Sequence, residues 1–244
     1  MNKHFDIAIV IPVFRDTEKC CSLINRIRNW PKQPAEIVVV SAEQNKVLLN
    51  FCADNNCQYT TAHECRGTQL DIGAKLTKAA VLWFLHADSV PDSKSLNIIE
   101  TKCLNNYGSG HFKFRFTGER TWKKIFLESL IKFRILLGGI AYGDQGLFMQ
   151  RQNYLDCGGF DNQPLFEEIR LVKNLRKKTQ FQSLNTPIGV SPRRWIQGGW
   201  IKQSLKNRIL VIRYLLGTQA EKLAHSYYMA PKAQNFTADQ EPKK

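Results

Sequence analysis

The sequence lacks several features that would assign it quickly to a class. Its seven cysteines include no C-x-x-C spacing, so neither a cysteine-rich metal site nor an even set of disulfides is predicted, and a reducing cytosol is favoured. No run reaches the roughly 18 apolar residues that a membrane-spanning helix needs. No secretory leader is expected, because a strand pattern begins soon after Met1. These absences predict a cytoplasmic protein, either soluble or attached peripherally to the inner face of the membrane.

Acidic residues are also scarce, with 21 against 35 lysines and arginines, which gives a formal net charge of +14. Such a charge favours an anionic partner, either a nucleotide phosphate, an acidic lipid or a nucleic acid, and charge alone does not choose among them. The chain has no zinc-finger spacing and no RNA-recognition motif, and its basic residues form no single stripe. A nucleic acid is therefore not the expected partner.

The first half of the chain alternates strand and helix patterns. Continuous apolar runs without polar alternation are typical of strands that are covered on both faces. Strands are predicted at residues 7–11, 36–40, 58–61 and 81–85, and helices at residues 16–30, 47–55 and 68–78. This alternation predicts a parallel α/β sheet in one domain of the larger kind.

The second half has a mixed pattern. Strands are predicted at residues 111–116 and 147–149, and helices at residues 122–137, 167–177 and 195–216. The last helix is basic and amphipathic, so it suits either the protein core or an anionic membrane surface. We expect a single domain over residues 1–216, made of halves 1–108 and 109–194 and a helical extension 195–216. A polar tail, 217–244, follows, and its end is expected to be disordered.

The strand at 81–85 runs directly into polar residues. His86 and Asp88 follow its apolar run, and Pro91 prevents the strand from continuing. In open parallel sheets, ligands bind outside the carboxyl ends of the strands. His86 and Asp88 are therefore predicted to lie at a binding site.

Several short motifs occur together in a recognisable order. They are "IVIPVFRD" at 9–16, "RGTQLDIGA" at 66–74, "FLHADS" at 84–89, "YGDQGLFMQR" at 142–151, "GGF" at 158–160, "PLFEEIRL" at 164–171 and "RRW" at 193–195. In these motifs the chain resembles the family 2 glycosyltransferases, in particular a small bacterial branch with His-Ala-Asp in place of Asp-x-Asp. The resemblance implies an A-type glycosyltransferase fold, with a Rossmann-like, mostly parallel central sheet flanked by helices and a C-terminal helical extension. It also implies a nucleoside-diphosphate sugar as donor, an acceptor hydroxyl, and inversion at the anomeric carbon.

The resemblance assigns residues to the donor diphosphate. Asp88 would supply a hard oxygen ligand to a divalent cation, Mn²⁺ or Mg²⁺. His86 would bind Mn²⁺ or a phosphate, or it would only cap the strand. Arg66, in the loop before a helix, would contact the diphosphate beside the helix N-terminus. Asp71 would lie near the nucleotide, or it would only complement the helix dipole.

The nucleoside is expected to contact the ends of the first two strands. Pro12, Phe14 and Arg15 match the family segment around the nucleoside. The second strand of the family normally ends in an aspartate that binds the base, but this sequence has Ser41 there. A serine can still accept a hydrogen bond, though without charge.

The pair Glu167 and Glu168 matches the acidic pair with which the family opens a helix. The resemblance makes Glu168 the general base, and Glu167 its neighbour in the catalytic pair. At its ordinary pKa, Glu168 would be ionised at neutral pH and ready to accept the acceptor's proton. Two first-turn acids that complement a helix dipole would also explain the pair.

The resemblance implies an acceptor pocket farther along the chain. Flanking glycines let backbone approach a ligand closely. The residues placed there are Gly143, Asp144, Gln145, Arg194 and Trp195.

Two other functions remain to be weighed. A sugar-phosphate nucleotidyltransferase shares the α/β architecture but needs a glycine-rich loop after the first strand, and "IPVFRDTEKC" contains no glycine. A catalytically degenerate protein that only binds nucleotide sugars would fit the departures from the family pattern at Ser41, His86 and Glu168.

Overall fold

A computed structural model of the chain describes residues 5–105 and 108–228. The chain divides into two compact units, residues 1–192 and residues 193–244. The first unit contains the sheet and the predicted donor and catalytic residues. The second unit, as far as residue 228, consists of helices. We describe each unit separately.

A seven-stranded sheet forms the centre of the first unit, in the order β3-β2-β1-β4-β6-β5-β7. Pairing is parallel from β3 through β4 and between β5 and β7, whereas β6 runs antiparallel to its neighbours β4 and β5. All the other strands therefore run in one direction and end at one edge, which confirms the predicted fold class. The strands are β1 (Ile7–Val13), β2 (Glu36–Ser41), β3 (Gln58–Thr61), β4 (Val81–Phe84), β5 (Ser109–Phe116), β6 (Phe148–Gln150) and β7 (Phe181–Val190).

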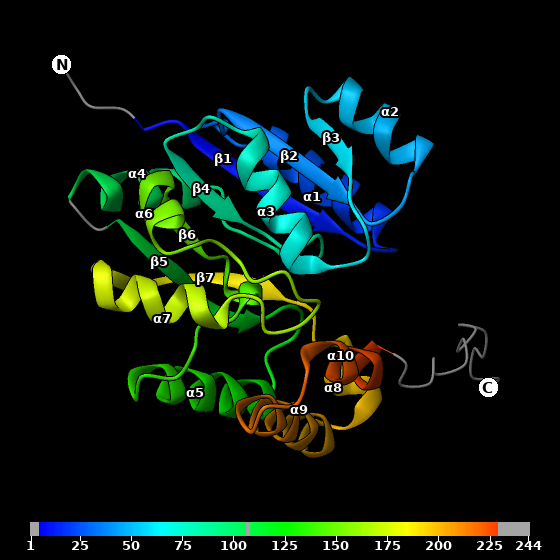
Figure 1. Cartoon of the computed structure of the whole chain (residues 1–244), viewed down its shortest axis with the longest axis vertical. Helices are drawn as coiled ribbons and strands as arrows, with labels where there is room; N and C mark the ends of the chain where they lie inside the picture. Colours follow the sequence, from blue (N-terminus) through cyan, green and yellow to red (C-terminus); the bar gives the residue numbers. More distant parts are fainter. Residues whose placement is uncertain (1–4, 106–107, 229–244) are drawn as a thin grey trace, which may run out of the picture. The chain divides into compact units, whose positions relative to one another are not determined.

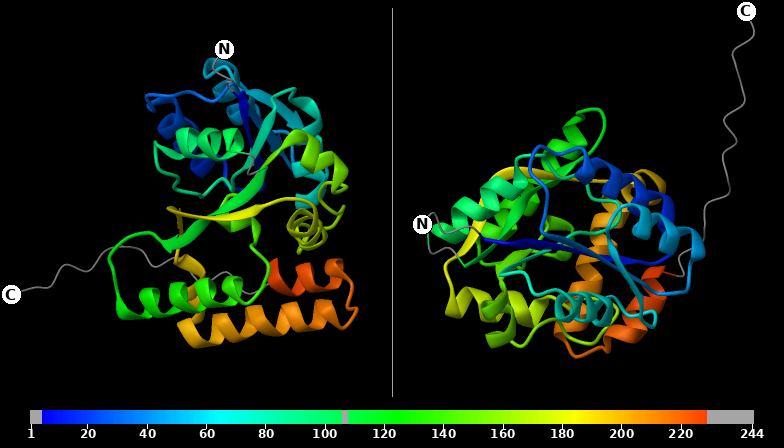
Figure 2. Two further views of the ribbon diagram at one scale, coloured as in Figure 1. Left: turned by 90° about the vertical axis from the view of Figure 1, so that its left-hand side faces the viewer. Right: turned by 90° about the horizontal axis from the view of Figure 1, so that it is seen from above.

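Helices cover both faces of this sheet (Figure 1, Figure 2). On β1, Ile9 and Ile11 face one core and Ala8 and Val10 face the other, because successive side chains point to opposite faces. Side chains of α1 (Thr17–Arg28), α2 (Lys46–Asp54) and α4 (Ser95–Leu104) fill the first core. Those of α3 (Arg66–Leu76), α6 (Arg151–Asp156) and α7 (Ile169–Lys178) fill the second. Burial on both faces explains the continuous apolar runs of β1, β2 and β4.

Two segments near the site differ from the sequence prediction. Arg66 is the first residue of α3, whereas we expected it in the loop before a helix that began at residue 68. Helix α7 begins at Ile169, so Glu167 and Glu168 precede it in a turn instead of opening it. Helix α4 and strand β7 were not anticipated. Helix α5 (Trp122–Leu136) packs against β5, and a short 3-10 helix, η1 (Gly143–Gln145), leads into β6.

The second unit corrects two further predictions. The helix expected over residues 195–216 is broken at Gly199, whose φ of 78° suits glycine, and this divides it into α8 (Arg193–Gly198) and α9 (Trp200–Leu215). The predicted polar tail contains a helix, α10 (Ala220–Tyr228), because Leu223 and Ala224 are buried apolar side chains within it. The end of the tail, predicted to be disordered, lies at residues 229–244, outside the described residues.

In the part of the chain that the structure describes, every helix is too short or too polar to cross a bilayer.

Candidate active site

The candidate site is built at the edge where the parallel strands end. The amide of Ala42 donates to the carbonyl of Val13 at 2.8 Å, which holds the ends of β1 and β2 together. Pro12 is the second-to-last residue of β1 and Ser41 is the last residue of β2, and His86 and Asp88 follow β4 at the same edge. The structure thus brings the predicted nucleoside and metal segments to one edge of the sheet.

Gln69 fixes the start of α3 to this edge. Its side chain is 3% exposed, and its amide nitrogen donates to the carbonyls of Val13 at 3.0 Å and Val40 at 2.8 Å. One buried amide therefore satisfies two strand-end acceptors and positions the helix that begins at Arg66. Sequence reasoning missed this role, although Gln69 lies inside the quoted motif at residues 66–74.

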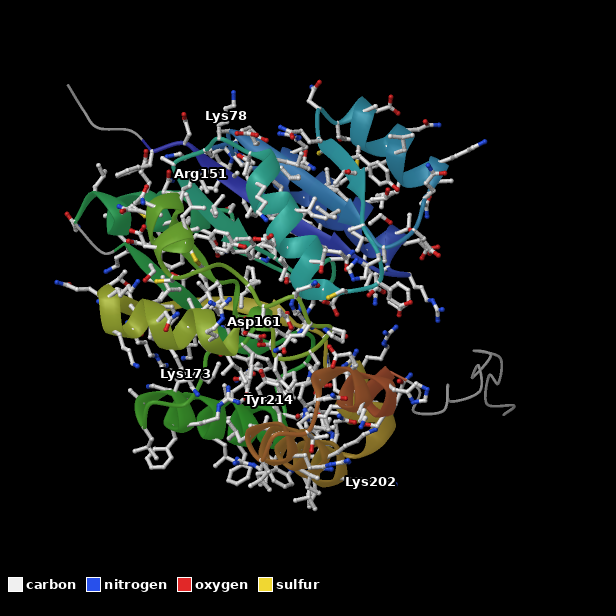
Figure 3. The ribbon with its side chains drawn as sticks, in the orientation of Figure 1. Lys78, Arg151, Asp161, Lys173, Lys202 and Tyr214 are labelled. Carbon is white, nitrogen blue, oxygen red and sulfur yellow. The ribbon has the colours of Figure 1, made fainter. Side chains whose placement is uncertain are left out.

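The far end of α3 is held separately. The Arg151 guanidinium, labelled in Figure 3, donates to the carbonyl of Ala74 at 3.0 Å and to that of Ala79 at 2.9 Å. An arginine that bonds the last carbonyls of a helix satisfies groups that otherwise lack partners. Gln69 therefore anchors the start of α3 to the sheet and Arg151, the first residue of α6, holds its end, so the first residue of α3 has a defined position.

Arg66 and Glu167 form an ion pair inside the site. Nε and Nη2 of Arg66 both donate to the Glu167 carboxylate, the second at 2.9 Å to Oε2. The side chain of Glu167 is fully buried, whereas that of Arg66 is 23% exposed. A two-point contact of this kind compensates the burial of the carboxylate. Arg66, predicted to contact the diphosphate, is thus directed at Glu167 in this structure.

The turn that carries the two glutamates is held against α3. The Asp161 amide donates to the carbonyl of Glu167 at 3.0 Å, and its carboxylate accepts from Arg170 at 2.6 Å. Asp161 is labelled in Figure 3. A Cβ at Gly67 would lie 1.9 Å from the Asp161 carbonyl oxygen, so only glycine allows this approach. Phe166 has a φ of 64°, which is uncommon for an aromatic residue and gives the turn its shape.

Glu168 is buried, with 1% of its surface exposed. Its Oε1 accepts a hydrogen bond from the Gly143 amide at 3.0 Å. Its Oε2 is buried and has no hydrogen-bond partner among the described residues. A buried carboxylate oxygen of this kind is costly when ionised, and it is a proton acceptor that no structural bond uses.

Burial raises the pKa of Glu168 from 4.5 to about 8, and the negative charge of Glu167 acts in the same direction. The positive charge of Arg66 and the hydrogen bond from Gly143 partly oppose this rise in pKa. The direction of this pKa shift opposes the expectation that Glu168 is ionised at neutral pH. The physical reason is that the turn buries both glutamates together, whereas we expected an exposed first turn of a helix.

Gly143 connects the strand-end motif to Glu168. A Cβ at Gly143 would lie 2.8 Å from Nε2 of His86, so the imidazole packs directly over the glycine. The same glycine donates its amide proton to Glu168. His86 and Asp88 are both half-buried. His86 of the predicted donor motif and Glu168, the predicted base, thus lie on either side of the backbone at Gly143.

Other predicted residues have structural partners. Gln145 is buried and its amide nitrogen lies 3.4 Å from the carbonyl of Phe112, so it packs against β5. Asp144 precedes it in η1. Asp71 accepts a hydrogen bond from the Tyr154 hydroxyl at 2.9 Å and forms an ion pair with Lys75.

In the predicted nucleoside segment, Pro12 and Ser41 are buried and only the side chains of Phe14 and Arg15 reach the surface. Arg15 is exposed, has a φ of 57°, and places its guanidinium 4.6 Å from the centre of the Phe14 ring. The Ser41 hydroxyl donates to the carbonyl of Glu43 at 2.7 Å, within its own turn. An arginine placed over a phenylalanine ring at the surface presents both a cation and an aromatic group.

Arg194 and Trp195 lie in the second unit. The guanidinium of Arg194 lies 4.4 Å from the centre of the Tyr227 ring, and the indole nitrogen of Trp195 donates to the Ser204 hydroxyl at 3.3 Å. Both contacts are internal to that unit.

The described residues contain no cluster of three or more histidine, cysteine, aspartate or glutamate side chains that could hold a metal ion. Asp88 and His86 offer one oxygen and one nitrogen donor. A divalent cation at this edge would therefore need further oxygen ligands from phosphates and water, which is common for Mg²⁺ and its relatives.

No protein-family model and no curated protein sequence matches the chain. Its fold, however, is similar to those of solved glycosyltransferases. A mannosyltransferase from Pyrobaculum calidifontis, in complex with GDP-Man and Mn²⁺, has a TM-score of 0.63 at 10% identity over 91% of this chain and 67% of that one. Glucosyl-3-phosphoglycerate synthase from Mycobacterium tuberculosis, in complex with Mn²⁺, UDP and glucosyl-3-phosphoglycerate, has a TM-score of 0.56 at 13% identity over 75% and 70%.

Mannosyl-3-phosphoglycerate synthase from Rubrobacter xylanophilus has a TM-score of 0.55 at 11% identity, over 77% of this chain and 67% of that one. The chain thus spans about two thirds of the length of the solved proteins that it matches. At these identities the similarity shows the fold, which is the A-type glycosyltransferase fold predicted from the sequence.

Proposed function

We propose that the protein is a glycosyltransferase that moves a sugar from a nucleoside diphosphate to an acceptor hydroxyl, with inversion. One observation carries the proposal: Gly143 contacts both His86, in the strand-end motif, and Glu168, whose Oε2 is buried without a partner. The strand-end motif would bind the departing diphosphate, and Glu168 would accept a proton. Their proximity suits the displacement of the diphosphate from the sugar carbon by an acceptor hydroxyl. The solved proteins of similar fold, which bind UDP or GDP-Man together with Mn²⁺, support the same donor class.

On the donor side, Asp88 and His86 would hold a divalent cation, Mn²⁺ or Mg²⁺. The cation would neutralise the charge that develops on the departing diphosphate. The stack of Arg15 on Phe14 suits the nucleoside, and Arg66 suits a diphosphate oxygen. Because Arg66 already donates to Glu167, a diphosphate at this position would share the guanidinium with the carboxylate.

On the acceptor side, Glu168 would act as the general base. The acceptor oxygen forms a bond to the anomeric carbon, the bond from that carbon to the diphosphate oxygen breaks, and its electron pair leaves with the nucleoside diphosphate. The acceptor proton moves to Oε2 of Glu168 in its ionised form, which is favoured once the turn opens and the pH exceeds the raised pKa of the buried carboxyl. Since Glu168 is shielded from solvent, the turn that carries it must open before an acceptor hydroxyl can reach Oε2.

Transfer assays with a panel of UDP-, GDP- and dTDP-sugars and Mn²⁺ test the proposal. Release of nucleoside diphosphate should depend on Glu168. Glu168→Gln keeps size and shape but removes the proton acceptor, so turnover should fall by about 10²–10⁴-fold with donor affinity retained. Glu168→Asp, which restores the usual family residue, should remain active.

Glu64→Gln, at an exposed glutamate outside the site, is the matched control and should turn over at the wild-type rate. Wild-type turnover by Glu168→Gln, under conditions where chemistry is rate-limiting, would exclude Glu168 as the base. Transfer at the same rate without a divalent cation would exclude a role for the cation in the reaction.

A second candidate is a catalytically degenerate protein that binds nucleotide sugars. The burial of Glu168 and its raised pKa favour this alternative, because a shielded, protonated carboxyl is a poor base. Tight binding of a donor sugar with neither transfer nor hydrolysis across the panel would identify the binder.

A further inference from the structure

Helix α5 has an apolar face that the first unit leaves exposed. Successive residues of a helix are 100° apart, and the large apolar side chains of this face fall within an arc of about 120°. The opposite face, with Lys124 buried, packs toward β5. The exposed members are Trp122 (72%), Ile125 (48%), Phe126 (56%), Phe133 (59%) and Leu136 (69%), with Leu137 (71%) at the C-cap.

The size of this face sets it apart from ordinary surface. With about 200 Å² for a fully exposed large apolar side chain, the exposed fractions give roughly 700 Å² of apolar surface, above the roughly 300–600 Å² of the largest patch on a typical monomer. An amphipathic helix normally directs one stripe inward and charged residues outward. Helix α5 is apolar on its outward face too, so that face is suited to a partner.

Cations flank this apolar arc on both sides. Lys123 and Lys132 are exposed at its two borders, and the Lys123 ammonium lies 5.8 Å from the centre of the Trp122 ring. The acidic residue of the helix, Glu128, projects from the opposite side and is bonded to Arg120 at 2.7 Å. The outward face therefore combines aromatic and aliphatic side chains with positive charge and carries no carboxylate.

We propose that α5 lies on an anionic lipid surface, with its apolar arc in the headgroup boundary and its lysines on the lipid phosphates. Charge complementarity selects this occupant, because an interfacial helix binds through apolar burial and attraction to anionic lipid together. Tryptophan at the first position suits the boundary, since its ring has a large apolar surface and a polar nitrogen. Attachment through α5 would then keep the candidate active site of the first unit close to molecules in or near the membrane.

Co-sedimentation of the full chain with vesicles of phosphatidylglycerol and phosphatidylcholine tests this proposal. We expect binding to vesicles that contain phosphatidylglycerol, weaker binding to pure phosphatidylcholine, and a fall in binding at high salt. The double variant Trp122→Ser with Phe126→Ser should lower partitioning by roughly tenfold or more. The charge variant Lys123→Glu with Lys132→Glu should lower partitioning on anionic vesicles alone. Because this variant leaves the apolar arc intact, it also tests the proposal if the first variant folds poorly.

The matched control is Val47→Ser with Leu76→Ser, two exposed apolar residues on α2 and α3, and it should bind as the wild type does. Absence of binding by the wild type would overturn the proposal. Unchanged binding by both α5 variants would overturn it as well, because attachment would then reside elsewhere, for example at Ile201 and Leu205 of α9. A concentration-dependent dimer in light scattering that the Trp122 and Phe126 variant abolishes, without vesicle binding, would assign the face to a second copy of the chain.

Discussion

The buried carboxyl of Glu168 should make the stability of the fold depend on pH. Its pKa is about 8 in the folded chain against 4.5 for an ordinary glutamate. Between these two values the folded chain holds a proton that the unfolded chain releases. The stability that this proton contributes is fully present below about pH 4.5 and is lost as the pH rises through about 8.

The magnitude follows from the two pKa values. When the folded chain binds one more proton than the unfolded chain, the free energy of unfolding falls by about 1.4 kcal/mol for each pH unit. Across the whole interval the loss is about 5 kcal/mol, which is a large part of the stability of an ordinary domain. Glu168→Gln keeps a carbonyl oxygen to accept from Gly143 but has no proton to lose. Its stability should therefore lack this slope.

Urea unfolding of the wild type and of Glu168→Gln, from pH 5 to pH 9, measures the effect. The difference between the two free energies should grow in favour of the variant as the pH rises, and it should level off above pH 8. Glu64→Gln, at an exposed site, should follow the wild type at every pH. If the wild type and Glu168→Gln show the same pH dependence, Glu168 is not protonated in the folded chain, and the reasoning from its burial fails.

Three other substitutions test the rest of the site. Asp88→Asn should weaken binding of UDP or GDP in the presence of Mn²⁺, because an amide oxygen has no charge for the cation; unchanged affinity in calorimetry would remove Asp88 from the ligands. Glu167→Gln should lower the free energy of unfolding by about 2 kcal/mol, since it removes the anion that Arg66 pairs with, and a thermal midpoint equal to that of the wild type would contradict this. Gly143→Ala should displace His86, because its methyl group would lie 2.8 Å from Nε2. The turnover of Gly143→Ala should fall while its circular dichroism spectrum stays native. Turnover at the wild-type rate would show that the position of His86 does not matter for the reaction.

Much of the fold is predictable because its parallel core has a simple pattern. Strands β1 and β4 are apolar throughout, and β2 is apolar between its terminal Glu36 and Ser41, so burial on both faces identifies all three without any knowledge of their neighbours. Helix α4 has a similar signal, with Leu96, Ile99 and Cys103 buried at helical spacing, but it is short and follows the site motif closely.

Strand β7 could not be predicted in the same way. It lies at the edge of the sheet and buries few of its apolar residues, among them Leu184 and Ile188. It also contains Pro187, which argues against a strand unless that strand is an edge strand. Its pairing with β5 is a long-range contact, and no local pattern reports it.

The position of the candidate site was also predictable, whereas its internal bonds were not. The polar residues after β4 indicate the carboxyl edge, and the resemblance to a family supplies Glu168. The Arg66–Glu167 ion pair joins residues 101 positions apart, and the bonds of Gln69 to Val13 and Val40 join residues 56 and 29 positions apart. Local sequence does not specify such contacts, because the same arginine is equally able to face a ligand.

The two adjacent glutamates differ because only one of them has a cation. Arg66 contributes one positive charge, and Glu167 and Glu168 would contribute two negative charges if both were ionised. In a buried turn, the group of three side chains is neutral only when one carboxyl holds a proton. Glu167 accepts two bonds from the guanidinium, whereas Glu168 has one backbone donor and an unbonded Oε2. The pKa of Glu168 is therefore raised, and under the proposed mechanism the carboxyl that Arg66 does not reach is the one available as the base.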